Sequence, residues 1–355
     1  MRLAALMASA FAACGYAADP SFVIIPDVHL AYGLYGQPHT WNNQVAWIVA
    51  NHTAYNIQGV FSVGDINAQG SWTTSAWQGS TGSGGFKAID ALGIPWGIAV
   101  GNHDNEAGET QGESSRIFTQ FNASIGYSRI SGKPWFGGYW SGDPYDQKTN
   151  FYETFTEPTT GRKFLVLFFE IFPRPEALTW AADIINAHET YEVLVITHGY
   201  MKTDGSLIAA TDGYGPDHYN LNGDASGIDL RNWAKRFPNM RAIFCGHWIA
   251  SPYHAVRKDT AADRHPFYGV FTNFQATPSP TSADVLLVTF GSSAVTFRLV
   301  NTNTGAFETA SPNMGSDLDI AFPWAPIDPR FDSPRRHEPR PHADAHMHAS
   351  RNPAE

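Results

Sequence analysis

Five short segments of the sequence contain side chains of the types that bind divalent metal ions, and each directly follows an apolar run. Carboxylates, imidazoles and an amide carbonyl are ligands suited to Mn, Fe, Zn or Co. One carboxylate can bridge two such ions about 3.5–4 Å apart, and such pairs activate water for in-line displacement at phosphorus. The residue types therefore favour two-metal hydrolytic chemistry, and the candidates are Asp27, His29, Asp65, Asn102, His103, Asp104, His198 and His247.

Taken singly, each of these residues has an ordinary structural explanation. Asp27 or Asp65 could cap a helix or a turn. Each histidine could be an interior residue with satisfied hydrogen bonds. The joint occurrence of all five segments at strand ends favours a functional site over packing.

The elements that would position these residues can be read from the hydrophobic pattern. Apolar runs at 22–25, 59–63, 96–100, 191–197 and 241–245 predict the five strands, and 163–171 predicts a sixth. Helical spacing at 39–52 and 176–188 lies between them, so an α/β fold is expected. Because ligands in open α/β sheets bind beyond the carboxyl ends of strands, we expect the five segments to meet at one edge.

The pattern changes after residue 266. Three β-rich runs follow one another with turns and no helix between them, and they predict antiparallel strands at 267–275, 283–291 and 294–302.

The order Asp-x-His, Gly-Asp, Gly-Asn-His-Asp, His and Gly-His, spread over residues 22–247, resembles the calcineurin-like metallophosphoesterase superfamily. It is most similar to secreted bacterial-type members, whose last strands follow a segment like the NFQ at 273–275. The resemblance implies an α/β fold, a four-layer α/β/β/α sandwich of two mixed sheets. It also implies a metal-dependent phosphoric ester hydrolase.

The resemblance implies a role for each matching position. Asp27 and His29 would hold the first of two divalent ions (Mn, Fe, Zn or Co), and Asp65 would bridge both. A metal-activated hydroxide would attack phosphorus. On the catalytic side, His103 would give a proton or hydrogen bond to the leaving oxygen, and Asp104 would orient its loop. The second ion would be held by Asn102, His198 and His247.

The sequence departs from the family pattern at Ile249. The family ends its last motif Gly-His-x-His, and the second histidine completes the first metal site; isoleucine cannot ligate. Water or substrate could fill the gap and leave a weaker first ion. His254 could fold back into the site, although its spacing favours a plain loop histidine. Alternatively, the protein works with one metal or has lost activity.

The expected substrate is a small-molecule or lipid-type phosphate ester, with a diester favoured over a monoester. Polar insertions at 70–86 and 212–227 flank motif loops, where binding residues are common. Aromatic residues in the first insertion or next to motif histidines could form an apolar wall or simply anchor the loops; they are Trp72, Trp77, Tyr200 and Trp248.

Two other functions compete with hydrolysis of this kind. A degenerate metal- or ligand-binding protein would keep the fold with little turnover. A purple-acid-phosphatase-like enzyme is disfavoured, because that family lacks the histidine matching His29. It also has a metal-binding tyrosine after its Gly-Asp, where this chain has Ile66, Asn67 and Ala68.

Charge argues against nucleic acid as a partner. The chain of 355 residues has 23 basic and 33 acidic residues, a formal net charge of −10. Non-specific nucleic-acid binding needs basic groups that displace counterions. No nucleic-acid-binding surface is therefore expected.

The N-terminal segment predicts export. Residues 1–17 combine Arg2, an apolar stretch and small residues suited to cleavage, the pattern of a signal peptide. A buried helix or lipid attachment at Cys14 are the alternatives. No later apolar run reaches the 18 or so residues of a spanning helix, so a secreted or periplasmic protein is expected. Cleavage would leave Cys245 without an internal disulfide partner.

The expected domain organisation is a signal peptide at 1–17, a metallophosphoesterase domain at 20–310 and a Pro/His-rich disordered tail at 311–355. Histidines in the tail could bind metal weakly, but a solvated tail is favoured; they are His337, His342, His346 and His348.

Overall fold

The computed structural model describes residues 19–30, 38–67, 75–78, 84–108, 112, 116–262, 264–275, 284–309, 311 and 321–324. The predicted signal peptide at 1–17, Trp72 and most of the 311–355 segment lie outside the described residues. Side chains of residues 38–40 and 75 are likewise outside them.

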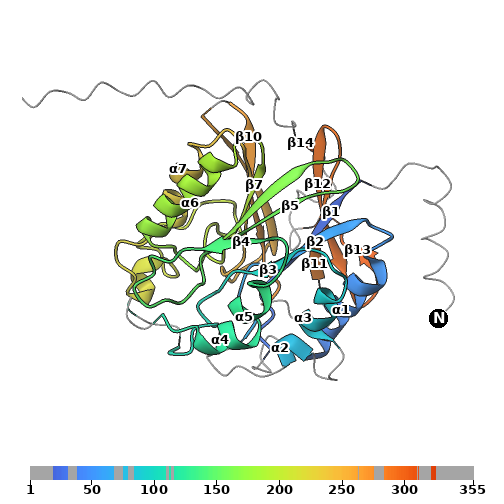
Figure 1. The fold of residues 1–355 in the computed structure, drawn as a ribbon, viewed down its shortest axis with the longest axis horizontal. Helices are drawn as coiled ribbons and strands as arrows, with labels where there is room; N and C mark the ends of the chain where they lie inside the picture. The colour runs from blue at the N-terminus through green and yellow to red at the C-terminus, as the bar shows by residue number, and fades with distance from the viewer. Residues whose placement is uncertain are drawn as a thin grey trace, which may run out of the picture.

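Seven strands form the first sheet (Figure 1). β1 (Ser21–Ile25), β2 (Ile57–Ser62) and β3 (Trp96–Ile98) run parallel. β11 (Asp284–Phe290) pairs antiparallel with β1 and leads to β12 (Ala294–Asn301). The short β13 (Ala306–Phe307) and β14 (Ala321–Pro323) both pair with β12.

The second sheet also has seven strands, and its spatial order is β4-β5-β6-β7-β8-β10-β9. Its parallel centre consists of β6 (Lys163–Phe168), β7 (Glu192–Ile196), β8 (Met240–Cys245) and β10 (Pro266–Thr272). Antiparallel strands flank it: β4 (Phe136–Tyr139), β5 (Phe151–Thr156) and β9 (His254–Thr260). Both sheets are mixed, so the predicted α/β fold class is confirmed.

The two sheets pack face to face between two helical layers. On β6, Phe164 and Phe168 belong to the core that joins the sheets, whereas Leu165 and Leu167 face the core under α6 and α7. Phe22 of β1 contacts Phe164 across the interface, with ring centroids 4.8 Å apart. The alternation explains why these strands are apolar throughout.

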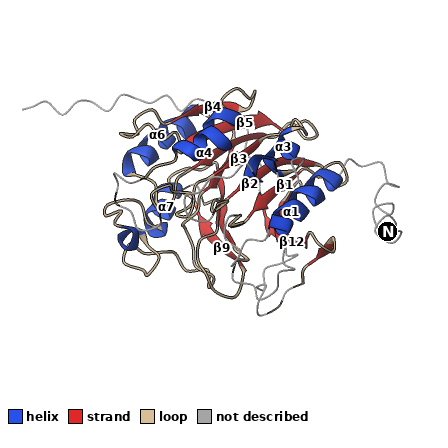
Figure 2. Ribbon diagram, turned by 90° about the horizontal axis from the view of Figure 1, so that it is seen from below, coloured by secondary structure: helices blue, strands red, loops and turns tan. Residues whose placement is uncertain are grey.

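Figure 2 shows α6 (Pro175–Ala187) and α7 (Gly227–Ala234) on one side of the strands and α1 (Pro38–Asn51) and α3 (Gly85–Asp90) on the other. These four helices make the two outer layers. The remaining helical segments are short and lie in the connections: α2 (Ser75–Gln78), α4 (Thr119–Ser124), α5 (Tyr127–Ile130) and the 3-10 helix η3 (Pro216–Tyr219).

The prediction of three consecutive antiparallel strands after residue 266 is wrong for the first of them. β10 belongs to the second sheet, parallel to β8 and antiparallel to β9. Its partner β9 has the polar sequence HAVRKDT and was not predicted as a strand. The pairing of β11 with β12 is antiparallel, as expected.

Part of the predicted tail belongs to the packed domain. β14 adds to β12, and the next residue, Trp324, is buried. Its indole N–H donates to Glu192 Oε2 at 2.7 Å. Residues 321–324 therefore lie in the domain, beyond the boundary expected at residue 310.

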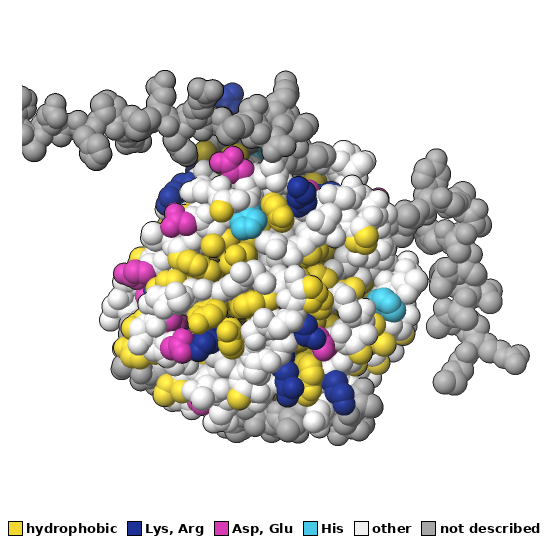
Figure 3. All heavy atoms as spheres, in the orientation of Figure 1, with side chains coloured by type: hydrophobic (Ala, Val, Ile, Leu, Met, Phe, Trp, Pro, Cys, Tyr) yellow, Lys and Arg dark blue, Asp and Glu magenta, His cyan; other side chains and the backbone are white. Residues whose placement is uncertain are grey.

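The described surface is mixed in character. On the face drawn in Figure 3, Lys and Arg side chains are scattered among acidic and uncharged ones. Within the described ranges, no helix is both long and apolar enough to cross a membrane.

Candidate metal centre

The five motif segments meet between the two sheets. Segments after β1, β2 and β3 come from the first sheet, and those after β7 and β8 come from the second. The expected single sheet edge is therefore a pair of facing edges. Backbone bonds tie the segments: Val28 and His29 N–H both donate to the Asp65 carbonyl (3.0 and 2.9 Å), and Gly246 N–H donates to the His198 carbonyl (3.1 Å).

Two motif glycines permit close approach of the backbone to the candidate ligands. A Cβ on Gly101 would lie 2.0 Å from Asp65 Oδ1, and one on Gly246 would lie 2.0 Å from Asp27 Oδ1. No side chain fits at such distances. The glycines of the Gly-Asn-His-Asp and Gly-His motifs thus leave room for the carboxylates.

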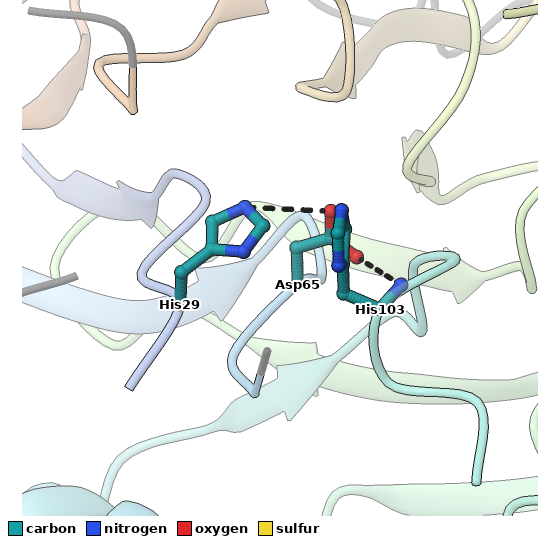
Figure 4. A group of neighbouring side chains, drawn as sticks. All are labelled: His29, Asp65 and His103. Carbon is teal, nitrogen blue, oxygen red and sulfur yellow. Dashed lines mark hydrogen bonds and ion pairs between the residues drawn. The ribbon is translucent and has the colours of Figure 1, made fainter. Parts of the chain in front are cut away.

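Asp65 lies at the centre of the cluster. Its Oδ2 is 3.0 Å from His198 Nε2 and 3.6 Å from His29 Nε2. Figure 4 shows His29, Asp65 and His103 approaching one another from separate loops, with the His103 backbone N–H donating to Asp65 Oδ1 at 2.9 Å. Two groups have ligand atoms within 4.8 Å of one another, and Asp65 is common to both: His29, Asp65 and His103, and Asp27, Asp65 and His198.

One buried atom of a predicted ligand, Asn102 Oδ1, has no hydrogen-bond partner among the described residues, and His198 Nε2 has only the Asp65 carboxylate beside it. The other ring nitrogen of His198, Nδ1, bonds the Val63 carbonyl at 2.9 Å, which leaves Nε2 directed at Asp65 Oδ2. Buried polar atoms are rarely left unpaired. An unpaired amide oxygen, and an imidazole nitrogen directed at a carboxylate, fit divalent metal ions.

His247 sits at the centre of a tight turn. Its φ is 75°, and Trp248 N–H bonds the Gly246 carbonyl at 2.9 Å, the pattern of a strained γ-turn. His247 N–H faces Asp27 Oδ2 at 3.1 Å. Its ring Nε2 bonds the Tyr214 carbonyl at 2.9 Å, so Nδ1 is the nitrogen left for a metal.

Three of the nine described non-glycine residues with left-handed backbone lie in the cluster. His29 and Asp65 also have left-handed φ values, 51° and 49°. Such conformations cost about 1–3 kcal/mol each in non-glycine residues and persist where the surroundings enforce them, often at functional sites. The hydrogen bonds between loops supply that enforcement here.

Burial and charge set the protonation of the cluster. Burial lowers the pKa of His29 to about 4 and that of His247 to about 3, so both rings are neutral near pH 7, as metal ligands must be. Burial opposes ionisation of Asp65, but the His198 and His103 imidazoles hold its pKa well below the ordinary value. Although burial opposes its protonation, the Asp65 and Asp27 carboxylates raise the pKa of His198 to about 9. The Asp65 and Asp27 carboxylates thus favour a positive charge within the buried cluster.

Asp104 is occupied by the backbone. Its Oδ2 accepts from the N–H groups of Asp65 (2.8 Å) and Gly101 (3.0 Å), and its Oδ1 accepts from Asn67 N–H (3.0 Å). These contacts agree with the expected orienting role. They give no support to counting Asp104 among the catalytic residues, because the carboxylate is directed at backbone groups.

His103 differs from the other motif histidines in its exposure. It is half-buried, whereas His29, His198 and His247 are buried. Its ring packs edge-on against His29, with centroids 4.6 Å apart. An imidazole at the open side of the cluster is placed to meet a substrate.

Neither Ile249, which occupies the gap position, nor His254, which could have filled the gap, belongs to a metal-ligand group. Ile249 is 37% exposed. His254 begins β9, where its Nδ1 is 3.1 Å from the Thr272 hydroxyl, and neither metal-ligand group contains it. His254 is therefore not a member of either ligand group, but it lies in a strand and not in the predicted loop.

Residues that sequence reasoning left without a role complete the cluster. Asn273 Nδ2 donates to Asp27 Oδ2 at 3.0 Å, and Gln275 Oε1 is 2.7 Å from His29 Nε2. The NFQ segment drew attention through the family resemblance alone. No sequence signal points to the Tyr214 carbonyl, since every residue has a backbone carbonyl.

Of the three described members of the expected aromatic wall, only Trp248 lies near the metal cluster. Trp77 packs on Trp96, with ring centroids 6.0 Å apart, and Tyr200 is fully buried in the core under α6 and α7. Both anchor structure. Trp248 is half-buried beside Tyr214 (ring centroids 5.3 Å apart), next to His247.

Comparisons with known proteins give low similarity throughout. No family model matches the chain. Among curated proteins, "Uncharacterized protein YvnB" of Bacillus subtilis (strain 168) is 25% identical over 169 residues, which is 48% of this chain and 12% of that protein. The chain thus matches only a small part of this relative's length.

Two solved structures are similar in outline. A dimetal phosphatase from Danio rerio is 11% identical with a TM-score of 0.49, and the match covers 79% of this chain and 96% of the other. GAP50, described as the anchor in the inner membrane complex of Plasmodium, is 10% identical with a TM-score of 0.43, covering 85% and 91%.

Proposed function

We propose that this chain is a metal-dependent phosphoesterase of the calcineurin-like metallophosphoesterase superfamily, which hydrolyses phosphate esters. The observation that supports this most strongly is Asp65, whose carboxylate is shared by two groups of metal-ligand side chains. A buried carboxylate common to two ligand groups is what a dinuclear site requires.

The proposed ligands divide between two ions. Asp27, His29 and Asp65 would hold the first, although the ligand atoms of Asp27 group with those of His198, and those of His103 with those of His29. Two bound divalent cations would supply Lewis-acid activation of water and of the phosphoryl group. The second would be held by Asp65, Asn102, His198 and His247, of which Asn102 has a buried, unpaired oxygen.

The chain's own residues would perform the remaining tasks. His103, half-buried at the cluster, would give a proton to the leaving oxygen. Asp104 would keep the loops after β2 and β3 in register through its three backbone bonds. The Val63 and Tyr214 carbonyls would fix the ring orientations of His198 and His247.

The substrate would be a small-molecule or lipid-type phosphate ester, with a diester favoured over a monoester. The half-buried Trp248 and the exposed Tyr214, beside His247, could contact its apolar part. From the N-terminal pattern, we propose that the protein acts outside the cytoplasm, as a secreted or periplasmic enzyme.

The direct test is a panel of chromogenic phosphate mono- and diesters. Metal-depleted protein should show no turnover, and Mn, Zn, Fe or Co added singly should restore it. Faster turnover of diesters would support the finer proposal. No turnover on any ester with any ion, in protein that binds both metals, would reject the enzymatic function.

Ile249 favours one alternative, a binding protein with the same fold and little turnover. The residue cannot ligate and lies 37% exposed where the family has its last histidine. Such a protein would bind phosphate esters and metals in the same panel without releasing product.

A further inference from the structure

We propose that the side-chain carbonyl of Gln275 is the ligand that completes the first metal site, in place of the histidine that Ile249 replaces. The inference rests on the proposed dimetal centre. It assigns a function to the NFQ segment at 273–275, which follows β10 directly.

The first support is distance. Gln275 is buried, 7% exposed, and its Oε1 lies 2.7 Å from His29 Nε2. His29 Nε2 is in turn 3.6 Å from Asp65 Oδ2. Ligands that each lie about 2.0–2.2 Å from one ion are separated from one another by roughly 3 Å. The two separations, 2.7 Å and 3.6 Å, lie on either side of that value, so His29 Nε2 has a suitable neighbour on each side.

The second support is the orientation of the amide. Asn273 Nδ2 is within hydrogen-bonding distance of Gln275 Oε1 (3.3 Å) and of Asp27 Oδ2 (3.0 Å). Gln275 N–H donates to Asn273 Oδ1 at 2.9 Å, which closes a local turn. Asn273 thus holds the Gln275 carbonyl, rather than its NH₂ group, toward His29 and at the same time bonds an Asp27 oxygen.

The third support is the position of the competing residues. Ile249 has no ligand atom, and the exposed side chain follows the γ-turn at His247. His254 Nδ1 is directed at the Thr272 hydroxyl in the β9–β10 pair. Of these three positions, Gln275 alone has a ligand atom within hydrogen-bonding distance of a predicted first-site residue.

The substitution has a chemical consequence. An amide oxygen is a harder donor than an imidazole nitrogen, and oxygen ligands suit Mn better than Zn. The first site should therefore discriminate less strongly against Mn than a site completed by histidine. This preference can be measured without any substrate.

The experiment compares the full chain with Gln275→Ala, Gln275→His and the control Ile249→Ala. Each protein is loaded with Mn, dialysed and analysed for metal, and Mn affinity is measured by calorimetry. Wild type and Ile249→Ala should bind two ions. Gln275→Ala should bind its second ion at least about 100-fold more weakly, since loss of an outer hydrogen-bond partner alone costs about 10- to 100-fold. Gln275→His should bind two ions, and the metal preference of its first site should shift from Mn toward Zn.

Thermal unfolding of the metal-free proteins shows whether each variant is folded. A structure of the Mn-loaded protein separates ligation from a hydrogen bond to His29: Oε1 should lie about 2.2 Å from the ion. Equal Mn affinity in Gln275→Ala and wild type, or an oxygen that stays on His29 away from the ion, overturns the inference.

The failure of this inference differs from that of the proposed function. If two ions bind, one of them through Gln275, and no ester is hydrolysed, the proposed enzymatic function is wrong and the assignment of Gln275 as a ligand stands. If wild type and Gln275→Ala both bind two ions and hydrolyse esters, the enzymatic function stands and the assignment of Gln275 as a ligand is wrong. Fewer than two ions in wild type would reject both.

Discussion

The Asp65 carboxylate is the one side chain of the described cluster that belongs to both ligand groups. It is buried, and His198 Nε2 and His29 Nε2 approach the same oxygen at 3.0 and 3.6 Å. Replacing one carboxylate there changes the charge seen by both proposed ions. Its effect should therefore exceed that of any other single ligand.

Asp65→Asn should abolish metal-dependent hydrolysis and leave the fold largely intact, because the amide keeps the shape and removes the bridging charge. Ester turnover at saturating metal measures the hydrolysis, and circular dichroism measures whether the fold is kept. Asp183→Asn, on the exposed side of α6, is the matched control. A variant with most of the wild-type rate would remove Asp65 from the bridging role.

His103→Ala should lower the turnover rate by roughly 10²- to 10⁴-fold, the usual scale of proton-transfer assistance. Metal content should change little, because the half-buried ring is proposed to act on the substrate. Elemental analysis of the purified variant provides the check. Loss of metal would instead make His103 a ligand, as its place in the group with His29 and Asp65 allows.

At the scale of elements, Asp104 joins the loop after β2 to the loop after β3. Asp104→Ala would leave the N–H groups of Asp65, Gly101 and Asn67 without their carboxylate partner. An unsatisfied buried donor costs about 1–3 kcal/mol. We expect urea unfolding of the metal-free protein to show a loss of at least about 2 kcal/mol.

The control for this prediction is Asp183→Ala, which should unfold like wild type. An Asp104→Ala protein with wild-type stability but no turnover would show that Asp104 takes part in the chemistry, as the sequence interpretation allowed.

The elements predicted best from sequence are those with strong, two-sided burial. β1, β7 and β8 follow apolar runs, and each ends within two residues of its predicted boundary. β9 escaped prediction because HAVRKDT is a polar edge strand with few apolar positions. Without β9, the place of β10 beside β8 in the second sheet could not be read from local pattern.

The Gly-His-x-His spacing in an extended segment would place the side chains of residues 247 and 249 on one face, and this expectation fails for a local reason. Alternation of side chains holds in an extended segment, but His247 has a φ of 75° and forms a γ-turn. The expectation that His247 and position 249 face the same way from extended backbone is therefore wrong.

At the scale of the whole molecule, the site joins segments that are far apart in sequence. His29 and Gln275 are 246 residues apart, and His247 meets a backbone carbonyl of the insertion at 212–227. Motif residues could be recognised because their types and spacing are specific. Gln275 and Tyr214 could not, since their contribution depends on how the two sheets face each other.

Asp284, at the start of β11, predicts a pH-dependent stability. It is fully buried, and its carboxyl oxygens have no hydrogen-bond partner in the described part of the chain. Burial, and then Glu308, raises its pKa from 3.8 to about 8. Between these values the folded state holds a proton that the unfolded state has lost. Its contribution to stability is therefore present below about pH 4 and is lost as the pH rises toward 8.

Asp284→Asn should flatten this dependence, because the amide does not ionise. Urea unfolding of metal-free protein at pH 5 and pH 8 measures it, with Asp183→Asn as control. The slope removed should approach 1.4 kcal/mol per pH unit, about the value for one proton. Identical slopes in wild type and variant would mean that Asp284 is ionised in the fold.

The central claim is that two ions sharing Asp65 hydrolyse phosphate esters. The most direct measurement is a titration of metal-depleted protein with Mn, following bound metal and hydrolysis of a chromogenic ester in the same samples. We predict no turnover without metal and a rate that saturates as the bound metal reaches two ions per chain. Turnover that persists in fully depleted protein, or its absence with two ions bound, would contradict the account.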